Sequence, residues 1–215
     1  MTRLRIVNLG LPKTGTTTLS RALRRANFSV ADWRIRPHQT KDSSLHNQHV
    51  GSLLYEDYFE GGDPLARLDA FDAINEMSVV RFDRNLWPQM DWGLLSAIQD
   101  HHPGTKFLLS HRDAAATASS MKRWLNLGDK RLPKLNVPGL PRRFGKSEGE
   151  LERWIDGHYK FCRQVFAGAD NFLEFDIADA EAPAKIGAFL GRPLQWWGHV
   201  NKNKPGAVKV AAEVE

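Results

Sequence analysis

Cysteine and long hydrophobic runs are almost absent from this sequence. Cys162 is the only cysteine in 215 residues, so an internal disulfide is impossible and a cysteine-based zinc site is disfavoured. The apolar stretch near the N-terminus, residues 6–11, is interrupted by Asn8 and Gly10. It is too short for a signal peptide, and no other stretch reaches the roughly 20 apolar residues that a membrane helix needs. We therefore expect a cytoplasmic protein without stable membrane insertion.

The remaining composition is typical of a globular protein. Hydrophobic residues make up 41% and charged residues 26% of the chain, which excludes wholesale disorder. The length corresponds to one domain with extensions, since a domain averages roughly 150 residues. We predict a single domain over residues 1–203 and a mobile tail over residues 204–215. A net charge of +5 favours an anionic partner without naming it.

Segments with strand character alternate with amphipathic segments along the chain. Such alternation predicts an α/β fold with three layers, in which helices cover both faces of a mainly parallel sheet. We expect strands over residues 4–9, 28–30, 70–77, 106–110 and 171–175, and helices over residues 16–27, 43–60, 87–102, 113–125, 147–166 and 181–190.

Residues 128–146 differ from this pattern. They are rich in proline, glycine, lysine and arginine and show no hydrophobic period. A connection of this length is usually functional or disordered. We interpret the segment as a basic insertion on the surface, which is either a disordered loop or a loop that faces the substrate.

A phosphate-binding loop is the clearest motif. Residues 10–19 follow a predicted strand and open a predicted helix, where backbone N–H groups and the helix N-terminus attract anions. The spacing from Gly10 to Gly15 matches a Walker A loop, but Thr16 stands where a nucleoside triphosphatase has lysine, and the lysine is Lys13. The motif predicts a fold like that of P-loop nucleoside triphosphate hydrolases. The displaced lysine indicates that the loop binds a phosphate group other than that of a nucleoside triphosphate.

The loop resembles the 5′-phosphosulfate loop of sulfotransferases that use 3′-phosphoadenosine 5′-phosphosulfate (PAPS) as donor. In that family a lysine within the loop reaches the oxygen that bridges phosphate and sulfate, a role that the resemblance gives to Lys13. The donor site would then be formed by Pro12, Lys13, Thr14, Gly15, Thr16, Thr17 and Thr18.

A second motif supports the resemblance. The predicted strand over residues 106–110 is followed by Arg112, and Ser120 lies eight residues further on. The resemblance implies that Arg112 and Ser120 bind the 3′-phosphate of the donor, a role that suits a guanidinium fork and a hydroxyl. The resemblance continues through C-terminal segments such as residues 175–176, 189–193 and 199–202, and it covers most of residues 4–204.

Sulfuryl transfer needs a general base for the acceptor proton. Glu76 is the first candidate, because it lies at the expected carboxyl end of a strand, where open α/β sheets bind ligands. A purely structural salt bridge or cap is the alternative for Glu76. Other candidates with weaker support are Asp72, His38, His46 and His111.

Aromatic and basic residues near the C-terminus are less informative. Trp196 and Trp197 would either stack on the adenine of the donor or anchor the last helix, and the anchoring role is favoured. Lys202 and Lys204 are candidates for further contacts with the 3′-phosphate.

The function hypothesis is a PAPS-dependent sulfotransferase that acts on a hydroxyl or amine acceptor, releases 3′,5′-ADP and needs no metal. Its acceptor would be a small molecule or a molecule of glycan or lipid type. Acceptor pockets in such a fold are formed by loops, and the loop sequences do not identify the acceptor. The alternatives are a P-loop nucleotide kinase or triphosphatase, and a non-catalytic nucleotide-binding relative. Nucleic-acid binding is disfavoured, because Phe144 is the only aromatic residue within the basic segment 128–146.

Overall fold

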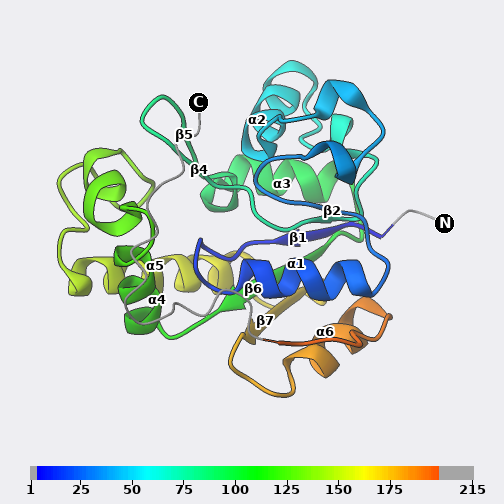
Figure 1. Cartoon of the computed structure of the whole chain (residues 1–215). Coiled ribbons are helices and arrows are strands. Elements are labelled where there is room, and N and C mark those ends of the chain that lie inside the picture. The colour runs from blue at the N-terminus through cyan, green and yellow to red at the C-terminus, as the bar shows by residue number, and fades with distance from the viewer. Residues whose placement is uncertain (1–3, 199–215) are drawn as a thin grey trace.

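A five-stranded parallel sheet forms the centre of the protein, whose computed structural model describes residues 4–198. The strand order is β2-β3-β1-β6-β7, and every neighbouring pair is parallel. The parallel sheet expected from the alternating pattern is thus confirmed (Figure 1). The strands are β1 (Ile6–Asn8), β2 (Val30–Ala31), β3 (Ala73–Ile74), β6 (Lys106–His111) and β7 (Phe172–Asp176), and β4 (Val79–Val80) and β5 (Asn85–Leu86) form a separate antiparallel hairpin.

Helices follow most strands. The α-helices are α1 (Thr16–Arg25), α2 (Val50–Gly61), α3 (Trp92–His101), α4 (Ala114–Lys122), α5 (Glu148–Val165) and α6 (Ala182–Leu190). Short 3-10 turns occupy Pro37–Gln39, Ser43–Leu45, Ala66–Leu68, Pro88–Met90 and Leu132–Lys134, and Leu127–Arg131 is a π-helical turn. Within residues 4–198, no helix is both long and apolar enough to cross a membrane.

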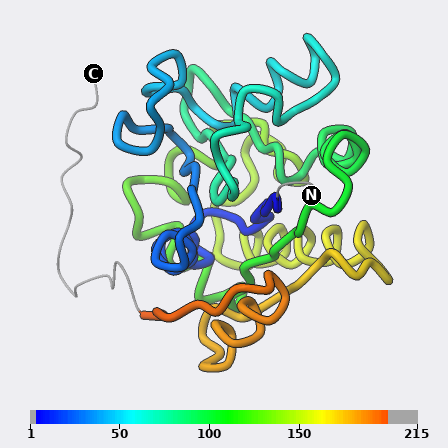
Figure 2. The backbone as a smooth tube through the Cα atoms, turned by 90° about the vertical axis from the view of Figure 1, so that its right-hand side faces the viewer, coloured from blue at the N-terminus to red at the C-terminus, as the bar shows by residue number. Residues whose placement is uncertain are grey.

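Two hydrophobic cores lie on opposite faces of the sheet. On one face Ile6 and Leu108 pack with α1 and α6, and these two helices lie side by side in both views (Figure 2). On the other face Val7 and Phe107 pack with α2, α3, α4 and α5. Successive strand residues point to opposite faces, so this alternation gives the three-layer α/β/α arrangement.

The boundaries of several elements differ from those expected. For example, β3 covers only Ala73–Ile74, and α3 begins at Trp92 rather than at residue 87. The strand expected over residues 28–30 lies at Val30–Ala31, and the helix expected from residue 43 begins only at Val50. Asn47 has a left-handed backbone (φ 66°) and His49 is extended, so the chain cannot continue as a helix through them. The end of this helix, expected at residue 60, is confirmed to within one residue: α2 ends at Gly61, and Gly62 after it adopts φ 82°.

The longest helix, α5, begins as its sequence predicts. Ser147 Oγ accepts a hydrogen bond from the N–H of Glu150, and the Glu150 carboxylate accepts one from the N–H of Ser147. This reciprocal pair satisfies two N–H groups that a helix start leaves unpaired. Further along α5, His158 Nε2 lies 2.8 Å from the carbonyl oxygen of Leu9, which joins the helix to the end of β1.

The basic segment 128–146 is not a surface excursion. It contains the π-helical turn, the adjoining 3-10 turn and an isolated bridge between Val137 and Leu140. Trp154 of α5 donates from Nε1 to the carbonyl oxygen of Pro138 at 2.8 Å. The apolar residues lack a regular period, so the sequence pattern did not reveal that they are buried. Those in the core are Leu132, Leu135, Val137 and Leu140.

We predict that this segment contributes to stability through its buried leucines. Leu132 is fully buried, so Leu132→Ala should lower the free energy of unfolding by about 2–5 kcal/mol. Phe144 of the same segment is 54% exposed, and Phe144→Ala should change stability by at most about 0.5 kcal/mol. Urea unfolding of both variants measures the difference, and equal effects would contradict the packing.

Candidate functional site

The ends of three neighbouring strands are tied together by one buried side chain. Asn8 Nδ2 donates to the carbonyl oxygen of Asn75 at 2.9 Å. Its Oδ1 accepts from the N–H of Gly10 at 3.2 Å and from that of Ser110 at 3.3 Å. The carboxyl ends of β3, β1 and β6 therefore meet at the point where the strand order changes direction, which is where open α/β sheets bind ligands.

The phosphate loop is shaped by two glycines. A Cβ atom on Gly10 would lie 1.8 Å from Ser110 Oγ, and one on Gly15 would lie 2.3 Å from Ile177. Gly15 also adopts φ 95° and Lys13 φ 78°, conformations that only glycine adopts without cost. The loop therefore follows one tight path from β1 into α1.

Backbone donors at the end of this loop have no partner in the described part of the chain. Within residues 4–198, the N–H groups of Gly15, Thr16 and Thr17 donate to no protein acceptor. The first turn of α1 also contains no acidic residue. Unpaired N–H groups and the positive end of the helix dipole together are suited to bind an anion.

Most threonine hydroxyls of the loop bind the protein itself. Thr14 is buried, and its Oγ1 lies 2.7 Å from the Leu11 carbonyl oxygen and 2.8 Å from Ser110 Oγ. Thr16 donates to Glu76 at 3.0 Å, and Thr18 donates to the carbonyl oxygen of Gly198 at 3.0 Å. The hydroxyl of Thr17 is exposed, and Pro12 is buried. Thr17 and the backbone are thus the parts of the loop open to a ligand.

Lys13 lies against an aromatic ring that sequence reasoning did not select. Its Nζ is 4.9 Å from the ring centroid of Trp124, in the turn after α4. A cation over an indole face is stabilised by the quadrupole of the ring. Trp124 therefore positions the lysine at the mouth of the phosphate loop. The sequence offered no signal for this, because residues 13 and 124 meet only through the tertiary fold.

Glu76 lies beside the phosphate loop. Its Oε2 accepts the hydrogen bond from Thr16, while Asn75 Nδ2 donates to the Thr16 carbonyl oxygen at 2.8 Å. Burial, and to a smaller extent the negative charge of Asp32, raise the pKa of Glu76 to about 7, against the opposing effects of the Thr16 hydrogen bond and the Lys13 charge. A carboxyl group with this pKa changes its ionisation near neutral pH.

Asp72 has a structural role instead. Its Oδ2 accepts from the N–H of Ser29 at 2.7 Å and from the hydroxyl of Ser29 at 2.8 Å. Asp72 precedes β3, at the opposite end of this strand from Glu76. It therefore lies away from the phosphate loop and is not placed to accept the acceptor proton.

Arg112 is brought next to the loop by β6. The hydrogen bond between Thr14 and Ser110 joins the loop to the end of this strand. The Tyr159 hydroxyl holds the backbone of Arg112, since it donates to the carbonyl oxygen at 3.1 Å. Within residues 4–198 the Arg112 guanidinium forms no ion pair with a carboxylate. Ser120 is buried on the following helix, α4.

The candidate histidines lie in different surroundings. His111 ends β6, and its ring centroid is 4.7 Å from that of Tyr159. His46 Nε2 lies 3.0 Å from the Thr40 carbonyl oxygen. His38 lines a surface hollow of about 570 Å³ together with Ala70, which precedes β3. His111 is therefore the histidine at the carboxyl edge of the sheet, and His38 lies toward the amino edge.

Trp197 anchors the last described segment. Its ring centroid is 6.0 Å from that of Phe175, within the core under α1 and α6. Trp196 lies under the guanidinium groups of Arg21 and Arg25, at 5.5 and 5.0 Å. These contacts correspond to the anchoring role favoured from the sequence. Lys202, Lys204 and the tail 204–215 lie outside the described residues.

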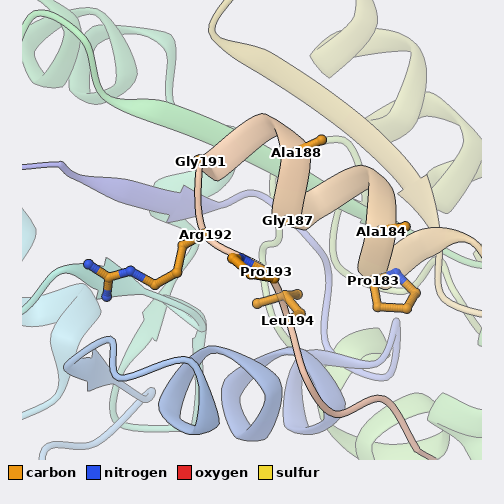
Figure 3. Close-up of a pocket in the computed structure, with 8 residues that line it drawn as sticks. All are labelled: Pro183, Ala184, Gly187, Ala188, Gly191, Arg192, Pro193 and Leu194. Carbon is orange, nitrogen blue, oxygen red and sulfur yellow. The ribbon is translucent and has the colours of Figure 1, made fainter.

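A second surface hollow lies on α6, away from the phosphate loop. It has a volume of about 560 Å³ between the helix and residues 191–194, and its lining is mostly apolar (Figure 3). Arg192 extends away from the helix and stacks at 4.1 Å on the ring of Phe28. The hollow shares no residue with the site. In the described part of the chain, no three His, Cys, Asp or Glu side chains are grouped to hold a metal ion.

Comparison with known proteins assigns the family. A model of the sulfotransferase domain matches residues 5–204, so this chain belongs to the sulfotransferase-domain family. A search of curated proteins finds no match. Among solved structures the chain is similar to mouse sulfotransferase SULT7A1 complexed with PAP, with 17% sequence identity and a TM-score of 0.48. The similarity covers 88% of this chain and 57% of that one, so this chain spans little more than half the length of the mouse structure.

The raised pKa of Glu76 predicts a stability that depends on pH. An unfolded glutamate loses its proton near pH 4.5, whereas Glu76 keeps it to about 7 in the folded state. The folded state then holds the extra proton, so stability falls as pH rises through this window. Glu76→Gln should lack this decline, and Glu60→Gln, at an exposed site, should retain it. Urea unfolding at pH 5 and pH 8 tests this, and parallel curves for wild type and Glu76→Gln would contradict the assignment.

Proposed function

We propose that this chain transfers a sulfuryl group from PAPS to a hydroxyl or amine acceptor and releases 3′,5′-ADP. The observation that carries the proposal is the meeting of an anion-binding loop, a lysine and a carboxyl group at one edge of the sheet. Thr16 joins them, since it opens α1 and donates to Glu76. Family membership supports the same reaction class.

The donor would occupy the edge between β1 and β6. The N–H groups of Gly15 and Thr16 would bind the 5′-phosphosulfate, and Lys13 would lie beside the bridging oxygen. Arg112 follows the neighbouring strand, and a forked guanidinium suits a phosphate. With Ser120 on α4, it would bind the 3′-phosphate. A nucleotide phosphorylated at both positions could then span the two sites.

The transfer step needs positioning and charge stabilisation more than covalent chemistry. The acceptor oxygen or nitrogen attacks sulfur in line, and the bond from sulfur to the bridging oxygen breaks. The electron pair of that bond moves to the 5′-phosphate, where Lys13 stabilises the negative charge as it develops. The acceptor proton moves to the Glu76 carboxylate. Because this role needs an ionised Glu76, the rate should rise with pH up to about 7.

The kinase or triphosphatase alternative is less well supported. Thr16 stands in place of the Walker lysine, and its hydroxyl is bound to Glu76. The non-catalytic alternative differs from the proposal only at Glu76, so a variant of this residue separates the two. The proposed acceptor remains a small molecule or of glycan or lipid type rather than a nucleic acid.

Selectivity for a 3′-phosphate is the direct test of the donor site. We predict that 3′,5′-ADP binds at least about tenfold more tightly than 5′-AMP, because a hydrogen bond to a charged group contributes roughly 1.5–3 kcal/mol. Arg112→Gln should remove most of this difference. Calorimetric titration of both nucleotides, with ATP–Mg²⁺ as comparison, measures it. Equal affinities for 3′,5′-ADP and 5′-AMP, or tighter binding of ATP–Mg²⁺, would count against the proposal.

Removal of the proposed base should affect turnover rather than donor binding. Glu76→Gln keeps the shape of the side chain but cannot accept the proton, so the rate should fall by about 10²–10⁴. The affinity for 3′,5′-ADP should change little. Sulfuryl transfer from PAPS to a panel of phenols, amines and sugars gives the rate, with Glu60→Gln as the matched control. Full activity of Glu76→Gln would direct attention to His111.

A further inference from the structure

A second cation lies on the same aromatic ring as Lys13. The guanidinium carbon of Arg131 is 5.4 Å from the ring centroid of Trp124, and Lys13 Nζ is 4.9 Å from the same centroid. Contact with one ring places the two positive charges at most about 10 Å apart, which is comparable with the Debye length of roughly 8–10 Å. Arg131 therefore adds to the positive potential at the mouth of the phosphate loop.

Arg131 is held firmly but is not neutralised. Its Nη1 donates to the carbonyl oxygen of Val80 at 2.8 Å, while its Nε is buried and has no hydrogen-bond partner within residues 4–198. None of the carboxylates in this part of the chain forms an ion pair with it. Burial lowers the pKa of its guanidinium. A half-buried cation with an unmet donor is destabilising unless an anion binds it.

Arg131 lies between the phosphate loop and the hairpin that follows Glu76, the proposed base for the acceptor. Trp124 lies on the side of the donor loop, and Val80 lies in β4, four residues after Glu76. Arg131 thus bridges the lysine of the loop and the hairpin that follows the proposed base. Asn85 Nδ2 of the hairpin also donates to the Asn136 carbonyl oxygen at 2.6 Å. The hairpin and segment 127–146 are therefore fixed to each other, as their adjacency shows (Figure 1).

The free edge of the guanidinium suits a planar anion. Nε is buried and therefore closed to a ligand, whereas Nη2 is not buried and has no hydrogen-bond partner within residues 4–198. Nη2 and the second N–H of Nη1 are then the two neighbouring donors left for a ligand. This edge of arginine binds carboxylate, phosphate or sulfate oxygens in pairs. The contact with the Trp124 ring and the hydrogen bond to Val80 hold the group in place.

We propose that Arg131 forms an anion-binding subsite for an acceptor that carries a carboxylate, phosphate or sulfate near its reacting hydroxyl or amine. The inference rests on the proposed function for the location of the reacting groups. It goes beyond that function by naming the acceptor class, an anionic one, and the residue that selects it.

The test compares two probes that differ by one negative charge. 4-Hydroxybenzoate and 4-hydroxybenzamide have the same ring and the same phenol, and each is titrated by calorimetry into the protein saturated with 3′,5′-ADP. The wild type should prefer the carboxylate by about tenfold or more, as expected for a charge-assisted pair. Arg131→Gln should abolish the preference, and Arg131→Lys should retain only part of it, because lysine lacks the fork.

A matched control separates the subsite from general positive charge. Arg142 is exposed in the same basic segment, and Arg142→Gln should retain the full preference. The affinity for 3′,5′-ADP should fall by less than about threefold in Arg131→Gln, because only a screened, long-range attraction is lost. An absent preference in the wild type, or one that survives Arg131→Gln, would overturn the proposal. A loss of 3′,5′-ADP affinity of about tenfold or more in Arg131→Gln would also overturn it, since Arg131 would then contact the donor directly.

Binding at the donor site and binding at the Arg131 subsite can be measured separately. If 3′,5′-ADP does not bind the wild type, the donor assignment in the proposed function fails. The same pair of probes is then titrated without nucleotide. A carboxylate preference that depends on Arg131 would still support the subsite, and its absence would refute it.

Discussion

The site depends on one buried amide, that of Asn8. Its two polar atoms hold the ends of β3, β1 and β6, through hydrogen bonds to Asn75, Gly10 and Ser110. A buried amide is stabilising only when its donors and acceptors are satisfied, so the three strand ends must keep their relative positions. The phosphate loop, Glu76 and Arg112 all follow directly from these ends, and their spacing is set before any ligand arrives.

The threonine-rich loop connects the nucleotide site to the proposed base. A row of hydroxyls beside a phosphate loop suggests donors for the phosphate, but Thr14, Thr16 and Thr18 bind protein groups. The backbone N–H groups remain for the anion. The hydrogen bond from Thr16 to Glu76 means that the start of α1 both binds the phosphosulfate in the proposed mechanism and orients the carboxyl group. Donor binding and proton acceptance would thus share one rigid element.

Segment 127–146 shows how a basic, irregular stretch can belong to the core. Leu132 and Leu140 are buried against α5 and its neighbours, while the half-buried Arg131 contacts Trp124, the ring that Lys13 also contacts. Burial of the leucines fixes the backbone, and the fixed backbone holds the guanidinium on Trp124. Hydrophobic packing of the segment therefore positions the Arg131 guanidinium, which would be mobile on a solvent-exposed loop.

The sequence by itself determined the order of strands and helices, the phosphate loop and the start of α5, because these depend on residues close together in the chain. The tight turn of the loop follows from Gly10 and Gly15, and the start of α5 follows from the capping pair Ser147 and Glu150. The roles of Asn8, Trp124 and Arg131 were decided only by the tertiary structure. Asn8 binds Asn75 and Ser110, Trp124 contacts Lys13, and Arg131 binds Val80. These partners are distant in the sequence, so no local pattern of period or spacing distinguishes the three residues from ordinary core or surface positions.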